Sequence, residues 1–128
     1  MLAGWLEASI TSPSLAAVRK ERAMLLADAL QQDGQVGAAD KLLTDFSEVR
    51  PNDPALWYQL AEVRGLARNI LGVHRARAEY FILVGQFERA SAQLRYAYRL
   101  AGDNSVLEGR IRQRLRDIDE LKKRIEEL

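Results

Sequence analysis

The feature that most constrains the fold is a small-residue pattern that occurs twice along the chain. Gly34 is followed five residues later by Ala39 and nine residues later by Leu43, and the same three residue types recur at the same offsets from Gly85. The two copies are 51 residues apart (85 − 34), which is one and a half times the period of about 34 residues of a common helix-turn-helix repeat. Small side chains let paired helices approach closely, so the pattern predicts helices stacked in a row.

Start and stop signals divide the chain into about six helices. Ser12 before Pro13, or Ser14, can begin the first, and Gly34, Gly85 and Gly102 stand where a left-handed residue would end a helix. The expected helices cover about residues 14–32, 36–49, 54–64, 70–84, 87–101 and 105–128. No run alternates between apolar and polar residues, so the expected fold is all-α: a first segment, 1–13, and one domain of helical repeats, 14–128.

Three helix starts carry capping residues in the sequence. Asp53 precedes Pro54 at the start of the third helix, and Asn69 can cap the fourth. Ser105 with Glu108 has the spacing of a capping box, which predicts that Ser105 caps the last helix.

Composition argues against catalysis and against a metal cofactor. The 128 residues include no cysteine and a single histidine, His74, so thiolate chemistry and cysteine-ligated zinc are excluded. Glu79 lies about 140° around a helix from His74, which does not suit a shared zinc site. No phosphate-binding glycine loop or nucleophile elbow occurs. We therefore expect no enzymatic activity and no cofactor in this chain.

Charge is unevenly distributed along the sequence. Residues 1–63 carry 5 basic and 9 acidic side chains, a sum of −4, whereas residues 64–128 carry 14 and 9, a sum of +5. Between Arg64 and Arg116, 11 basic residues face only 4 acidic ones. This bias leaves a nucleic-acid-binding helical repeat as an alternative function, provided that the arginines gather on one face. Arg75, Arg89 and Arg112 are expected to point in different directions instead.

Two stretches resemble the tetratricopeptide repeat. Residues 71–104 have the family's residue types in the expected places, and residues 20–53 match it more weakly. The matching residues are Ala78, Gly85, Phe87, Ala90, Leu94 and Ala97 in the first stretch, and Gly34, Ala39, Leu43, Phe46 and Pro51 in the second. The resemblance implies a superhelix of antiparallel helices in which the last one caps the stack.

A longer resemblance covers residues 20–124. The segments VHRARAEYF (73–81), GQFERASAQL (85–94) and RIRQRLRDI (110–118) are similar to the C-terminal tetratricopeptide region of bacterial periplasmic zinc metallopeptidases of the β-barrel assembly-enhancing protease type. In that family a separate His-Glu-x-x-His domain performs proteolysis, and this chain contains no such motif. The resemblance implies an accessory protein-interaction module of a longer periplasmic protein. Its partners would be outer-membrane assembly components or unfolded outer-membrane proteins.

The partner groove can be placed in two ways. If the first, third and fifth helices form the inner layer, the groove residues are Met24, Asp28, Tyr58, Glu62, Tyr96 and Arg99. If the stronger repeat at 71–104 sets the register, Arg75, Glu79 and Ile82 line it instead. The two registers conflict, because the segment from Pro54 also resembles the start of a repeat. In either register the expected core contains Trp57, Leu60, Ala78, Ala90, Leu94 and Ala97.

The last helix has two interpretations. Near-heptad spacing of Ile111, Ile118, Leu121, Ile125 and Leu128 could form a short dimer seam, or the same apolar face could cap the stack. We favour the cap, and hence a monomer, with a dimer through this helix as the alternative. No stretch reaches the roughly 20 apolar residues of a membrane span.

Overall fold

A computed structural model describes residues 13–128 of the protein, with side chains from residue 17 onward. Described residues form the helices α2 (Pro13–Gln32), α3 (Val36–Val49), α4 (Pro54–Leu66), α5 (Ile70–Leu83), α6 (Phe87–Leu100) and α7 (Ser105–Glu126). Residues 13–128 contain no strand, so the all-α prediction is confirmed for this part. The prediction of a separate segment at 1–13 lies almost wholly outside the described residues, as does Ser12; Pro13 itself belongs to α2.

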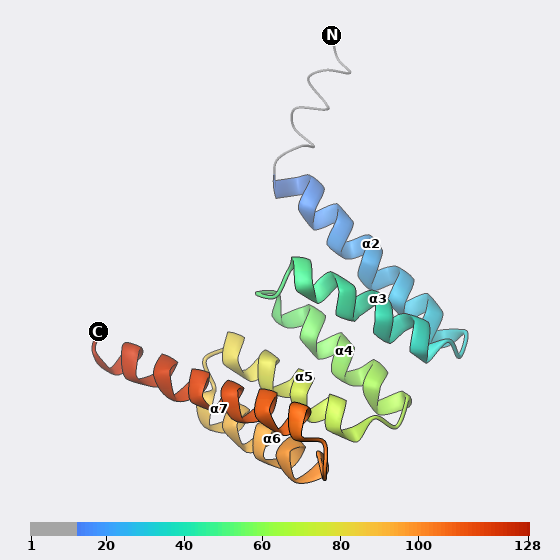
Figure 1. Ribbon diagram of the computed structural model, residues 1–128. Coiled ribbons are helices and arrows are strands. Elements are labelled where there is room, and N and C mark those ends of the chain that lie inside the picture. Colours follow the sequence, from blue (N-terminus) through green and yellow to red (C-terminus); the bar gives the residue numbers. More distant parts are fainter. Residues whose placement is uncertain (1–12) are drawn as a thin grey trace.

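Each helix packs against the next one in the chain, so the helices follow one another in order from α2 to α7 (Figure 1). Contacts also skip one helix: α2 packs against α4, and Arg114 of α7 pairs with Glu79 of α5. In these two cases, helices that are two apart in the chain touch each other directly. Lys20 of α2 adds an ion pair of 2.7 Å to Asp53 in the turn before α4.

Three turns between helices repeat at an even spacing. Gly34, Arg68 and Gly102 all have positive φ, at 81°, 60° and 60°, and each lies 34 residues after the previous one (68 − 34 and 102 − 68). In the first two turns the N–H of the next residue donates to a carbonyl five residues earlier, at 2.8 and 2.9 Å. This bond closes a helix through a left-handed residue. Gly85, with φ of 77°, ends α5 midway between the second and third.

Arg68 is the residue in these turns that is not a glycine, and its backbone conformation is unfavourable for a residue with a side chain. A side chain with a Cβ is strained in the left-handed region, by about 1–2 kcal/mol. Arg68→Gly is therefore expected to raise the free energy of unfolding by about 1 kcal/mol, measured by urea unfolding. Arg68→Ala, which keeps the Cβ, is the control and should give no gain. An equal gain in both variants would show that loss of the exposed arginine side chain, and not backbone strain, is responsible.

The predicted caps are correct at two helix starts and wrong at the third. Asp53 accepts from Ala55 N–H at 3.1 Å, and Asn69 accepts from Gly72 N–H at 2.9 Å. At α7 the cap is Asn104, whose Oδ1 accepts from the N–H of residue 107 at 3.1 Å. Ser105 is already the first helical residue, so the capping position is the one before it, where the Asn104 side chain reaches a free N–H group of the first turn.

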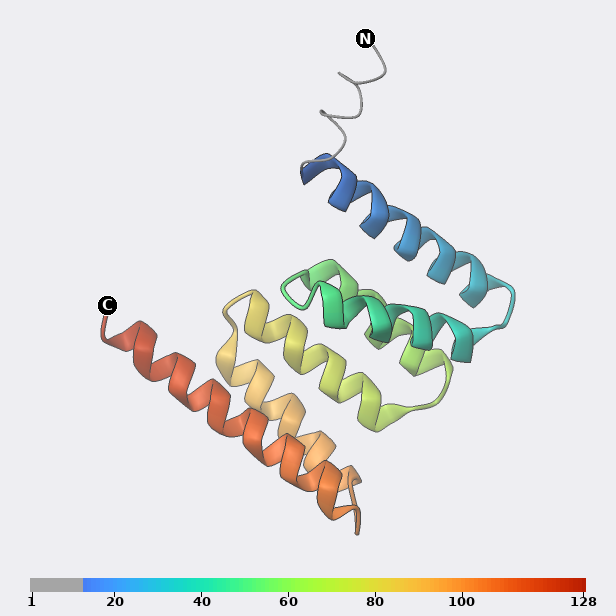
Figure 2. The ribbon, with the colours of Figure 1, turned by 45° about the horizontal axis from the view of Figure 1, so that its top comes forward.

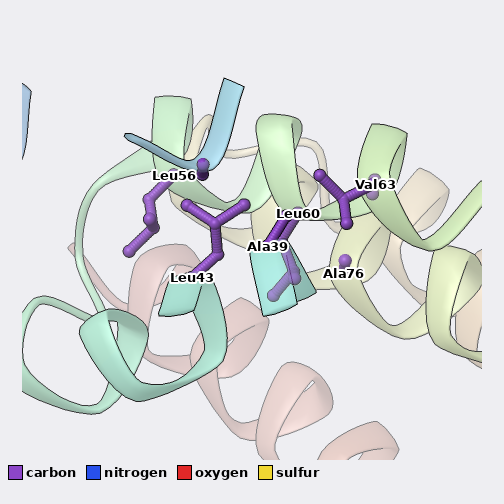
Figure 3. Close-up of a cluster of buried hydrophobic side chains, with 8 residues drawn as sticks. Ala39, Leu43, Leu56, Leu60, Val63 and Ala76 are labelled. Carbon is purple, nitrogen blue, oxygen red and sulfur yellow. The ribbon is translucent and has the colours of Figure 1, made fainter. Parts of the chain in front are cut away.

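The buried side chains form two clusters that meet at α5. The first lies between α2, α3, α4 and α5, and Figure 3 shows its side chains pointing toward one another. Its buried members are Ala27, Ala39, Leu43, Leu56, Leu60, Ala61, Val63 and Ala76. The second joins α5, α6 and α7 and contains Ala78, Ala90, Leu94, Ala97, Ala101, Ile111 and Ile118. Five of the six predicted core residues are buried; the exception, Trp57, is half-buried and donates from Nε1 to the Pro51 carbonyl at 2.8 Å.

The last helix uses its first half to cover the second cluster. Ile111 and Ile118 are buried against α5 and α6, and Lys122 pairs with Glu88 at the start of α6. Beyond that point Ile125 is half exposed, and the end of α7 extends past its neighbours (Figures 1 and 2). Part of the apolar face of α7 that could have formed a dimer interface is thus buried within the chain, as expected of a capping helix. None of the described helices combines the length and apolar character needed to cross a membrane.

Candidate binding sites

An open groove with a volume of about 790 Å³ lies between α2 and α4. Its surface is mainly apolar and includes Leu25, which is 69% exposed, and Tyr58, which is 56% exposed. The lining residues are Glu21, Met24, Leu25, Asp28, Ala55, Tyr58, Gln59, Glu62 and Tyr80. Large exposed apolar side chains that gather in a concavity mark a binding surface more often than scattered ones do.

Helical spacing places the groove residues on facing surfaces. Met24 and Asp28 are four residues apart on α2, as are Tyr58 and Glu62 on α4, so each pair lies on one face of its helix. Gln59 joins the two helices, because its Nε2 donates to the Met24 carbonyl at 2.9 Å. The Gln59 Oε1 is buried without a partner among the described residues. A direct hydrogen bond therefore links the two helices that form the groove.

The groove continues along the seam between α4 and α5. A smaller hollow of about 290 Å³ shares Tyr58, Glu62 and Tyr80 with it and adds Arg77. The rings of Tyr58 and Tyr80 meet edge to face with centroids 5.6 Å apart. The combined surface thus has carboxylates along α2 and α4, two tyrosines at its centre and one arginine beyond them.

Tyr96 and Arg99, the other two residues predicted for this groove, lie elsewhere. They are on α6, where the Arg99 guanidinium stacks on the Tyr96 ring at 4.8 Å. Tyr96 also packs against the ring of His74, with centroids 5.2 Å apart. Gln93 Oε1 accepts a hydrogen bond from His74 Nδ1 at 2.7 Å. The histidine therefore belongs to the contact between α5 and α6.

Arg75 and Glu79, predicted from the second register, line a different hollow of about 360 Å³. We call it the arginine hollow; it is bounded by α3, α4, α5, α6 and α7 and shares no residue with the groove. Its lining residues are Thr44, Ser47, Glu48, Trp57, Arg64, Arg75, Glu79, Leu94, Arg110, Ile111 and Arg114. Ile82, the third residue of that register, packs against the second core cluster.

Two of the four arginines in this hollow are held by protein groups. Arg114 donates from Nε and Nη2 to the two carboxylate oxygens of Glu79 at 2.8 and 2.7 Å, and from Nη1 to Asp117 at 3.1 Å. These bonds raise the pKa of Arg114. Arg64 donates to Asp40 at 3.4 Å and also reaches a hydroxyl of α3 and a carbonyl of α5, both at 3.2 Å. Both arginines therefore fasten neighbouring helices together.

The other two arginines have no such partner. Neither the Arg75 guanidinium nor the Arg110 guanidinium forms a hydrogen bond or an ion pair with any residue from 17 to 128. Burial lowers the pKa of Arg75, and the positive charges of Arg64 and Arg110 lower it further, against the opposing effect of Glu79. A half-buried guanidinium beside like charges is poorly solvated, and it would gain from an anion.

The two surfaces differ in the side chains that they offer. No set of three or more His, Cys, Asp or Glu side chains within the described part of the chain is arranged to hold a metal ion. The groove offers apolar area and carboxylates, and the arginine hollow offers guanidinium donors. Both arrangements are suited to holding a ligand.

Comparison with known proteins leaves the family open. Neither the protein-family models nor the curated proteins gave a match to this chain. The resemblance to the tetratricopeptide region of an envelope metallopeptidase therefore stays a prediction.

Sequence reasoning missed several residues of these surfaces, among them Leu25, Gln59 and Tyr80 in the groove. In the arginine hollow it missed Arg64, Arg110 and Arg114. Arg114 had a signal in the sequence, because it follows Glu79 by 35 residues, close to one repeat period. Gln59 contacts Met24 across the same separation. Tyr80 had no such signal, since it reaches the groove from α5 and not from α2 or α4, which carry the other lining residues.

Proposed function

We propose that this chain is a non-catalytic protein-interaction module that holds a segment of another polypeptide in the groove between α2 and α4. The observation that carries the proposal is the groove itself, with exposed Leu25 and Tyr58 and half-buried Met24 and Tyr80 around one hollow. Interface energy is concentrated in a few large side chains at such positions, and tyrosine is among the commonest of them.

We propose further that the helices form a superhelix of the tetratricopeptide kind. Support comes from the left-handed turn residues spaced by 34 and from the alanines at helix contacts, such as Ala39 and Ala90, which are fully buried. Repeats of this kind create an extended surface on one layer of helices. α2 and α4 would then contribute the inner layer.

Charge indicates what kind of segment the groove accepts. Glu21, Asp28 and Glu62 line it, and no cation lines it apart from Arg77 in the extension toward α5. A segment with an aromatic or aliphatic side chain next to a lysine or arginine would match both the apolar surface and the carboxylates. Such a segment is the proposed occupant.

The biological setting is proposed from the resemblance. An accessory module of a periplasmic zinc metallopeptidase would bring outer-membrane assembly components, or unfolded outer-membrane proteins, to a separate catalytic domain. The coding sequence upstream of Met1 offers a direct check on this link, because it should encode a His-Glu-x-x-His motif. The proposed binding in the groove does not depend on that result.

Nucleic-acid binding is the less favoured alternative. Arg89 lies over the Phe81 ring at 6.0 Å, and Arg112 donates to the Tyr98 hydroxyl at 2.8 Å, so neither joins the arginine hollow. Arg64 and Arg114 are also held in ion pairs, which makes these two arginines less available to phosphate groups.

Tyr58→Ala is expected to weaken binding of a groove ligand at least tenfold, because it removes the most exposed aromatic surface at the centre of the groove. An array of overlapping peptides from outer-membrane β-barrel proteins, immobilised on cellulose and probed with the protein, would identify ligands. These should contain an apolar residue beside a basic one. Isothermal titration calorimetry of the best peptide would then compare the wild-type protein with the variant.

Tyr96→Ala is the matched control, because Tyr96 is also exposed, at 46%, but lies on α6 outside the groove. It should leave the peptide's Kd unchanged. Equal losses in both variants, or a loss only with Tyr96→Ala, would contradict binding between α2 and α4. A peptide array with no ligand, combined with binding of single-stranded oligonucleotide, would favour the alternative function.

A further inference from the structure

Two of the positively charged side chains in the arginine hollow are not paired with a carboxylate of the described residues. Arg75 of α5 is half-buried and Arg110 of α7 is exposed at the edge, and neither meets a carboxylate within 4.0 Å among residues 17–128. The adjacent carboxylates are engaged: Glu79 and Asp117 bind Arg114, and Asp40 binds Arg64. Glu48 is the remaining acid of the lining and is exposed.

The hollow also has the space and the rigidity of a built site. Its volume of about 360 Å³ corresponds to roughly a dozen water molecules, at about 30 Å³ each, which leaves room for a small anion and its remaining hydration. Its walls come from five helices, and the Arg114–Glu79 and Arg64–Asp40 pairs fix the side chains on both sides of Arg75.

Guanidinium groups favour one class of ligand. Their planar donors match the oxygens of a carboxylate or a phosphate, and these charge-assisted bonds are stronger than neutral ones. Ser47 and Thr44 also line the hollow, but their hydroxyl groups already donate, to the Thr44 carbonyl at 2.6 Å and to Asp40 at 2.8 Å. The donors left for an anion are therefore those of the guanidinium groups.

We propose that the arginine hollow is a binding site for an oxyanion group, a carboxylate or a phosphate, in which Arg75 and Arg110 are the donors. Bound anion would place a negative charge between two like charges on α5 and α7 and so strengthen the contact between these helices. The site is separate from the peptide groove, and the proposal holds whether or not the groove binds a polypeptide.

The test is an NMR titration of the whole chain with sodium phosphate and, separately, with sodium succinate, at constant ionic strength set with sodium chloride. The Nε–Hε signals of Arg75 and Arg110 should shift along a saturable curve. Arg75→Gln is expected to weaken binding about tenfold, since one charge-assisted contact is lost. Arg75→Lys, which keeps the charge but not the planar fork, should fall between this variant and the wild type.

Arg116→Gln is the matched control, because it removes the same charge from an exposed position on α7 outside the hollow. It should bind as the wild type does, and backbone amide spectra would verify that each variant is folded. Saturation by phosphate alone or by succinate alone identifies which oxyanion the site takes. Linear, unsaturable shifts, or equal losses in Arg75→Gln and Arg116→Gln, would overturn the proposal, the latter by pointing to diffuse attraction of anions to a basic surface.

Discussion

Leu60→Ala is expected to lower the free energy of unfolding by about 2–5 kcal/mol, the largest stability effect of any substitution considered. Leu60 is fully buried in the first core cluster, where α3, α4 and α5 meet, so its removal leaves a cavity (Figure 3). The surrounding helices are close-packed through alanines and cannot collapse into the space without shifting. Urea unfolding followed by circular dichroism measures the change.

Leu66→Ala is the matched control, because Leu66 ends the same helix and is 56% exposed. It should change the free energy of unfolding by no more than about 0.5 kcal/mol. A loss at Leu60 no larger than the loss at Leu66 would mean that α4 does not pack at the centre of the first cluster. The described packing of α4 against α3 and α5 would then be incorrect, and so would the position of α4 in the groove.

The number and order of helices could be predicted from the sequence because their ends are marked locally. Glycines at the left-handed turns, and Asp53 and Asn69 at helix starts, act over a few residues and need no knowledge of the fold. A left-handed turn without a glycine could not be predicted in this way. Arg68 occupies such a turn. The small-residue pattern begins only at Gly34 and Gly85, and its spacing of 51 residues left the layer of each helix undecided.

The candidate site shows the same division between local and distant information. Taking the first, third and fifth helices as one layer placed Met24 and Asp28 with Tyr58 and Glu62, and the structure has these four side chains lining one hollow. This alignment could not decide how far the groove extends: Tyr96 and Arg99 lie on α6, where they stack on each other outside the lining of the groove. The arginine hollow depends on five helices at once, so no single stretch of sequence could indicate that Arg75 and Arg110 would be left without partners.

Ala39→Leu tests the packing on which both surfaces depend. Ala39 is fully buried in α3 against its neighbours, so three added carbon atoms would push α3 away from α2 and α4. The expected loss in the free energy of unfolding is about 1–3 kcal/mol. A second readout is the groove: if α4 is displaced from α2, the Gln59 bond to the Met24 carbonyl is strained, and the affinity for a groove peptide should fall as well.

Ala38→Leu separates packing from helix propensity, because Ala38 is adjacent in α3 but exposed. Both variants place the same leucine in the same helix, so only the difference between them reports on the contact with α2 and α4. Ala38→Leu should stay within about 0.5 kcal/mol of the wild type. If the two variants were equally stable, the close approach of helices over a small side chain would not be what holds the stack together, and a superhelix with a groove on its inner layer would lose its physical basis.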